Sequence, residues 1–130
     1  MKLTDIDFPS FKERMAKECK AKNACIEEYR KLLGANNINE LYEVLCRNYY
    51  WLYRNEIDCP LPDGLTVEVL YMNGCTGITE LPEGLTVEVL YMNGCTGITE
   101  LPEGLTVEVL VMRGCSPTIP LTARITTKIY

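Results

Sequence analysis

Residues 81–100 read LPEGLTVEVLYMNGCTGITE, and this stretch is one copy of a motif that recurs along the second half of the chain. Residues 61–80, LPDGLTVEVLYMNGCTGITE, differ from it only in carrying Asp63 where Glu83 stands. Residues 101–115 begin a third copy, LPEGLTVEVLVMRGC, before the pattern drifts. The motif thus restarts at a fixed period, which predicts a solenoid: each copy forms one coil, and stacked coils bury each other's apolar side chains.

Each copy places its apolar residues at the same spacing. In the second copy the inward-facing positions are expected to be Val87, Leu90, Met92, Cys95 and Ile98. They fit the frame L-x-x-L-x-L-x-x-C-x-x-L, which is the signature of leucine-rich repeats. Leu90 and Met92 flank Tyr91, an alternation that predicts a short strand with two inward side chains and one outward. Because so short a period leaves little chain for a full helix, we expect parallel strands on the concave face and extended or 3₁₀ segments on the convex face.

Residues 1–58 predict a helical cap that covers the apolar end of the solenoid. Apolar residues recur at helical spacing through this segment, and Gly34 is suited to end a helix. The three expected helices span residues 8–20, 24–33 and 38–54. Their expected N-caps are Asp7 or Ser10 for the first helix, Asn23 for the second and Asn37 for the third.

The last fifteen residues read as a degenerate copy of the repeat that serves as a C-terminal cap. Aligned without a gap on the preceding copy, Leu121 falls on Leu101 and Ile125 falls on Leu105. Lys128 then stands where the earlier copies carry Glu. The chain is thus expected to be an α+β solenoid in three parts: a cap over residues 1–58, leucine-rich repeats over 59–115 and a terminal cap over 116–130.

The composition is typical of a folded chain without a membrane-spanning segment. Apolar residues make up 47% of the sequence, but no run reaches the roughly 18 apolar residues of a transmembrane helix. The first seven residues, MKLTDID, lack the apolar core of a secretory signal. We therefore expect a chain that stays in a reducing cytoplasm or leaves it by a non-classical route.

The charge distribution excludes some classes of partner. The net charge of −5 arises entirely from residues 61–130, because residues 1–60 carry equal numbers of acidic and basic side chains. No Lys or Arg occurs from Leu61 to Met112. Nucleic acids and anionic membranes are bound through Lys and Arg, so neither is an expected partner.

Seven cysteines and no histidine limit the chemistry of the chain. Without an imidazole, Ser-His-Asp and Cys-His catalysis and His-containing zinc sites are excluded. Cys75, Cys95 and Cys115 recur at an inward position, and their spacing favours small buried side chains over a thiolate metal or redox site. We expect no catalytic residue, no metal and no cofactor.

The outward side chains of the strands are the candidate binding surface. Neighbouring strands lie about 4.8 Å apart, so equivalent residues should form columns. Tyrosines beside an acidic column suit a protein partner with a basic or partly apolar surface. Strand propensity and solvent screening offer an alternative account of the same tyrosines, valines and glutamates. The candidate residues are Glu68, Tyr71, Asn73, Glu88, Tyr91, Asn93, Glu108, Val111 and Arg113, with Val69, Val89 and Val109 between them.

The LPEGLT and GCTGIT segments resemble the repeats of bacterial leucine-rich-repeat proteins. Short copies that start with LPxxL also resemble the repeat regions of type III secreted effectors of enteric pathogens, which place helices before their repeats. The segment from FKERMAKE to YWLYRNEI is similar to uncharacterised proteins of gut bacteria. The resemblance covers residues 61–130 most clearly and implies the repeat fold. Effector ubiquitin ligases carry a separate catalytic domain after the repeats. The sequence in hand stops at Tyr130, so we expect no ligase activity to carry over from this resemblance.

These observations predict a non-catalytic protein–protein interaction module that binds through its concave strand face. The alternative is a structural or self-associating scaffold without a dedicated ligand, which the near-identity of the copies also fits. Such near-identity follows from recent duplication or from consensus design, and it leaves the partner and the oligomeric state open.

Overall fold

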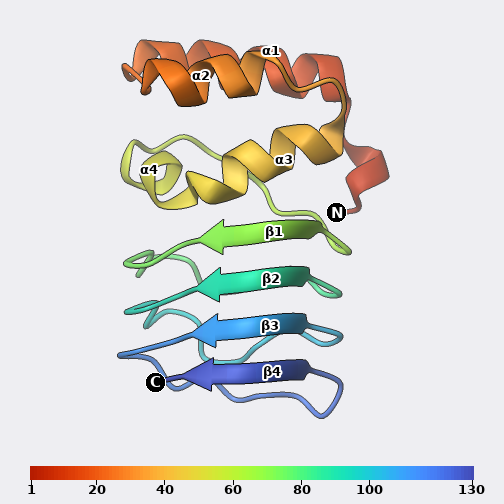
Figure 1. Cartoon of the computed structure of the whole chain (residues 1–130), viewed down its shortest axis with the longest axis vertical. Coiled ribbons are helices and arrows are strands. Elements are labelled where there is room, and N and C mark those ends of the chain that lie inside the picture. The colour runs from red at the N-terminus through yellow and green to blue at the C-terminus, as the bar shows by residue number, and fades with distance from the viewer.

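The computed structural model describes the whole chain, Met1–Tyr130, and shows four stacked strands below a group of helices (Figure 1). The strands are β1 (Thr66–Tyr71), β2 (Thr86–Tyr91), β3 (Thr106–Val111) and β4 (Arg124–Ile129). They form one parallel sheet in the order β1-β2-β3-β4. The chain therefore adopts the expected α+β solenoid, with turns and extended segments and no helix between consecutive strands.

The register of the first three strands follows the sequence period. Val67 pairs with Val87, and Leu90 pairs with Leu110, so that equivalent residues of successive copies lie side by side. Backbone hydrogen bonds also join the turns between coils, as where the Gly74 amide donates to the Asn93 carbonyl at 2.8 Å. The backbone N–H and C=O groups of each coil therefore find hydrogen-bond partners in the next coil. Buried backbone groups need such partners, and the stacked coils supply them.

The core is a continuous stack of the repeated apolar residues. Val87, Leu90, Met92, Cys95 and Ile98 are all buried, as are Leu101 and Leu105 on the return path. Val87 and Leu90 both point inward although only two residues lie between them, because the strand departs from strict alternation at Glu88 and Val89. Each fully buried aliphatic side chain contributes about 1.5–3 kcal/mol relative to an exposed one.

Gly97 marks a close approach between coils. A Cβ atom at this position would lie 2.6 Å from the carbonyl oxygens of both Thr76 and Ile78 in the preceding coil. Gly97→Ala should therefore force the two turns apart and lower the free energy of unfolding by about 1–3 kcal/mol. Chemical denaturation would measure this cost, with Thr96→Ala at the exposed neighbouring position as the control. Equal stability of the two variants would contradict the close packing of these turns.

The helical cap comprises α1 (Phe8–Ala21), α2 (Ile26–Leu33), α3 (Ile38–Arg47) and α4 (Tyr49–Arg54), after a 3₁₀ turn at Leu3–Asp5. Figure 1 shows α3 lying along β1, with α1 and α2 paired above it as an outer layer. The buried residues of helices and strands belong to one hydrophobic core. The cap thus covers the apolar end of the first coil, as the sequence predicted.

The helix ends agree in part with those expected. Asp7 caps α1 by accepting from the Ser10 amide, and Asn37 caps α3 by accepting from the Glu40 amide. Gly34 is the C-cap of α2. The prediction of Asn23 as the N-cap of α2 is wrong, because Asn23 lies in the preceding turn with φ of 58° and Cys25 occupies the cap position.

The expected third helix is divided in two at Asn48. This residue has φ of −111° and ψ of 18°, and its side-chain Nδ2 donates to the Val44 carbonyl at 2.8 Å. The same Nδ2 also donates to the Glu28 carboxylate on α2 at 3.0 Å. An asparagine that hydrogen-bonds to the backbone competes with the helical pattern, and here it ends α3 and lets α4 turn away.

The gapless alignment of the last coil is wrong, because this coil is shorter than the others. Arg124 pairs with Thr106 and Lys128 pairs with Leu110, whereas the earlier period would pair Thr106 with Thr126 and Leu110 with Tyr130. The shift is already present at Thr118, which bridges to Glu100, so the shortening lies just after Cys115. Lys128 therefore takes the strand position of a core leucine, and not that of a glutamate.

Candidate protein-binding surface

The outward side chains of the sheet form a surface that we call the strand face. It consists of the outward residues of the first three strands: Glu68, Val69 and Tyr71 of β1, Glu88, Val89 and Tyr91 of β2, and Glu108, Val109 and Val111 of β3. In register, Tyr71 lies opposite Tyr91, and Tyr91 lies opposite Val111. The sheet therefore brings the predicted tyrosine and valine columns together on one surface.

The two tyrosines form the largest apolar feature of the strand face. Their ring centroids lie 5.3 Å apart with an angle of 50° between the ring planes, a favourable tilted arrangement. Tyr71 is 40% exposed, a high value for so large a side chain in a strand, and Tyr91 is partly exposed. Val69, Val89 and Val109 continue this apolar strip as half-buried residues. The pair thus forms an aromatic ridge that is accessible to solvent.

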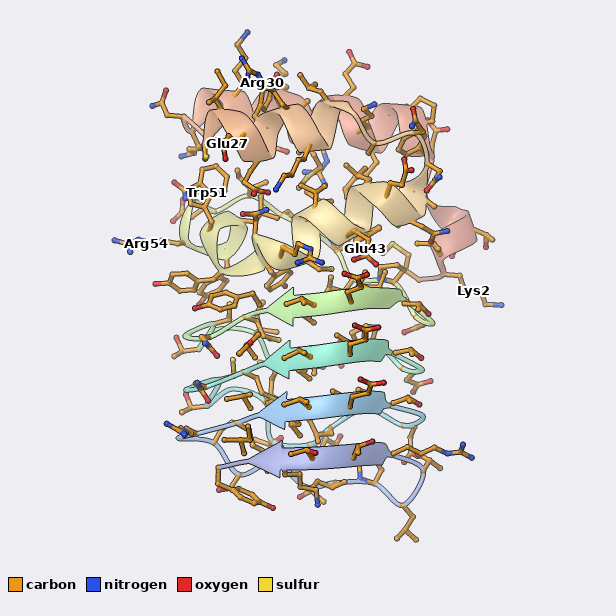
Figure 2. All side chains as sticks on the ribbon, in the orientation of Figure 1. Lys2, Glu27, Arg30, Glu43, Trp51 and Arg54 are labelled. Atoms are coloured by element: carbon orange, nitrogen blue, oxygen red, sulfur yellow. The ribbon has the colours of Figure 1, made fainter.

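A column of carboxylates borders the apolar strip. Glu68, Glu88 and Glu108 are exposed at equivalent positions of three neighbouring strands, and Figure 2 shows oxygen-tipped side chains stacked from strand to strand below Glu43. Glu68 forms an ion pair with Arg47 of α3, with Nη2 and Oε2 2.5 Å apart. Glu88 and Glu108 form no ion pair. Like charges at equivalent positions of strands about 4.8 Å apart repel, so a cationic ligand would stabilise this column.

Helix α3 contributes two residues to this surface that the sequence interpretation missed. Glu43 accepts a hydrogen bond from the Glu68 amide, with both carboxylate oxygens 3.2 Å from the nitrogen. Arg47 lies one helical turn later and pairs with the Glu68 side chain. Their i,i+4 spacing on the polar side of an amphipathic helix in the segment before the repeats was the available signal.

The candidate asparagines are engaged in hydrogen bonds between coils. The Asn73 side-chain oxygen accepts from the Asn93 amide at 2.8 Å, and the Asn93 side-chain oxygen accepts from the Arg113 amide at 2.7 Å. Asn73 and Asn93 therefore hold consecutive turns together at the end of the strands. The exposed Arg113 side chain ends this ladder and makes no ion pair.

The repeated cysteines are part of the packing between coils. Cys75 and Cys95 are fully buried, and the Cys95 thiol donates to the Met72 carbonyl of the preceding coil at 2.9 Å. Cys115 makes the equivalent contact with the Met92 carbonyl at 3.3 Å. Burial raises the pKa of the Cys75 thiol to about 12 and raises the pKa of Cys95 and Cys115 as well. Thiols of this kind are poor nucleophiles and poor metal ligands at neutral pH.

Two structural findings concern other kinds of site. No group of three or more Cys, Asp or Glu side chains is arranged to hold a metal ion. None of the helices combines the length and the apolar character needed to cross a bilayer.

Comparison with protein-family profiles, with curated proteins and with solved structures finds no match to this chain. The geometry described above is therefore the basis for assigning a function.

Proposed function

We propose that the chain is a non-catalytic protein–protein interaction module, built as a short leucine-rich-repeat array of the bacterial type. The strand face binds its partner, and the helices and the last coil serve as end caps. The observation that carries this proposal is the solvent-exposed Tyr71–Tyr91 pair beside two carboxylates without counter-ions. We place this activity in the cytoplasm, which suits a chain with seven unpaired cysteines.

The aromatic pair supplies the anchor that an interface needs. Tyrosines bury a large area at a low cost in side-chain entropy, and a few such residues dominate the binding free energy of most interfaces. The rings are already in contact with each other, so little further ordering is required on binding. The half-buried valines beside them extend the apolar contact without exposing a large apolar patch in the free protein.

The carboxylates set the chemistry of the partner. Glu88 and Glu108 lie next to the apolar strip and lack a cation, so Lys or Arg side chains of a partner would remove the repulsion between them. Arg47 already neutralises Glu68 at the α3 end of the column. The favoured partner therefore presents apolar side chains to the tyrosines and basic side chains beside β2 and β3. The same charges oppose binding of nucleic acids and anionic membranes.

Capture from a lysate of the native source, quantified by mass spectrometry, tests this proposal. Tyr91→Ala should weaken the retention of a specific partner about 30-fold or more, since hot-spot tyrosines contribute about 2 kcal/mol. Glu88→Lys should weaken the same capture by repelling a basic partner. Tyr130→Ala is the matched control, because Tyr130 is 72% exposed and lies outside the strand face. Undiminished capture by both strand-face variants, in proteins that melt like the wild type, would contradict the proposal.

A self-associating scaffold is the second candidate. The outer edge of β4 has no neighbouring strand, and this edge is where another chain could pair. Sedimentation of the purified protein distinguishes the two functions, because a monomer at high concentration excludes self-association. A dimer that persists in Tyr91→Ala would favour the scaffold.

A further inference from the structure

A small apolar cavity, partly open to solvent, lies between the helices of the cap and away from the strand face. Its volume is about 110 Å³, and it is lined by α2, α3, α4 and the end of α1. Nine of the eleven residues around it are hydrophobic. Figure 2 shows Trp51 rising from α4 towards α2, where it forms one wall. The residues on which the argument depends are Ala24, Cys25, Glu28, Tyr29, Asn48 and Trp51.

The cavity follows from features of the sequence already described. Asn48 ends α3, so that α4 turns and carries Trp51 across to α2. Ala24 and Cys25, just before α2, also line the cavity, and their side chains are small. Because the lining is apolar, water gains few hydrogen bonds there, and cavities of this kind favour apolar ligands.

One ionised group stands at the cavity. The Glu28 carboxylate accepts from Asn48 Nδ2 at 3.0 Å and from Lys31 Nζ at 3.1 Å. Hydrogen bonds from Asn48 and then from Lys31 lower the pKa of Glu28, so it is negatively charged at neutral pH. A carboxylate has about four acceptor positions, and these two donors leave others free. A ligand with an O–H or N–H group could therefore donate to Glu28 while its apolar part fills the cavity.

We propose that this cavity binds a small molecule with a single aromatic ring and one hydrogen-bond donor. An apolar protein cavity of about 150 Å³ takes one benzene, so a cavity of 110 Å³ has room inside for no more than one ring. Trp51 and Tyr29 provide aromatic walls for offset or edge-to-face contacts with this ring. The carboxylate of Glu28 fixes its orientation by accepting from the donor and disfavours anionic ligands.

The chain carries two built-in reporters for a test with phenol as the probe. Trp51 is the only tryptophan, so a change in its fluorescence reports directly on the cavity. Cys25 lines the cavity and is the only cysteine with an exposed side chain, so its alkylation by iodoacetamide should slow when the cavity is filled. Phenol should produce a saturable change in both signals. Fluorobenzene, which has no donor, should bind about tenfold more weakly.

Variants separate this site from nonspecific association. Ala24→Leu fills the cavity and should abolish both signals, whereas Ala21→Leu makes the same change at an exposed position of α1 and should leave them intact. Glu28→Met removes the acceptor at a similar side-chain length, and it should reduce the affinity for phenol to that for fluorobenzene without changing the latter. The proposal is overturned if phenol gives no saturable signal, if Ala24→Leu binds as the wild type does, or if phenol and fluorobenzene bind equally well. Glu28→Met remains decisive if Ala24→Leu does not fold.

Discussion

Raising the pH from about 7.5 to about 10 should unfold the protein, even with its thiols kept reduced. Cys19, Cys46, Cys59, Cys75 and Cys95 are buried, and burial raises the pKa of each thiol above its ordinary value of 9.0. The pKa reaches about 11 for Cys19 and about 12 for Cys75. The expected result is a cooperative loss of structure at a pH where most folded domains without buried acids remain intact.

The direction of the effect follows from proton binding. Above about pH 9 the unfolded chain releases its thiol protons, while the folded chain retains them until the pH reaches the raised pKa of each thiol. Stability that is complete below pH 9 is therefore lost as the pH rises from 9 towards 12. Each retained proton costs about 1.4 kcal/mol per pH unit, so the four thiols with the largest shifts, those of Cys19, Cys46, Cys59 and Cys75, together cost about 5–6 kcal/mol at pH 10. That cost is comparable with the whole stability of a typical domain, about 5–15 kcal/mol.

Circular-dichroism melts between pH 7.5 and 10.5 would measure this loss. Cys75→Ala should lower the free energy of unfolding at neutral pH. It should also make the fall of that free energy with rising pH less steep, because one fewer thiol proton is retained in the folded state. An unfolding free energy that is the same at pH 7.5 and at pH 10 would be incompatible with this account of the buried thiols.

Leu90→Ala should lower the free energy of unfolding by about 2–5 kcal/mol. Leu90 is fully buried in β2, between Leu70 of β1 and Leu110 of β3. In a solenoid each coil contacts only its neighbours, so a cavity in the second coil weakens the connection between the helical cap and the last two strands. In so short an array this loss should unfold the whole chain at temperatures where the wild type is folded.

Urea denaturation would give the free energy directly, and Val89→Ala provides the comparison. Val89 adjoins Leu90 but lies half-buried on the strand face, so its truncation should cost less than about 1.5 kcal/mol. A change in melting temperature of only a degree or two for Leu90→Ala would show that Leu90 is not a core residue.

The repeat period was sufficient to predict most of the architecture. The constant distance between copies implies that Val67 pairs with Val87 and Leu70 with Leu90, and both pairings occur. Identical residues at identical positions leave no other register that buries the same side chains. The tyrosine pair and the carboxylate column follow from this register, so the strand face could be located before the structure was known.

The remaining features depend on local chemistry that periodicity does not contain. The break at Asn48 arises from a side chain that bonds to both Val44 and Glu28, one of which lies on another helix. The shift of β4 arises from a shortening of the coil after Cys115, where the repeat has already lost its sequence. Arg47 reaches the strand face because α3 lies along β1, which is a tertiary arrangement. The cavity at Trp51 depends on the break at Asn48, so the sequence did not predict this cavity either.

The position of Lys128 bears on how many coils such an array can contain. Near-identical coils could in principle template one another without limit, as the growing end of a fibril does. Any strand added at the free edge of β4 would have to bury an ammonium group in line with Leu70, Leu90 and Leu110. An unpaired charge in an apolar interior is strongly unfavourable, so Lys128 opposes the addition of an apolar coil at this edge, and a second chain could pair with β4 only if it supplied a counter-ion for the ammonium group.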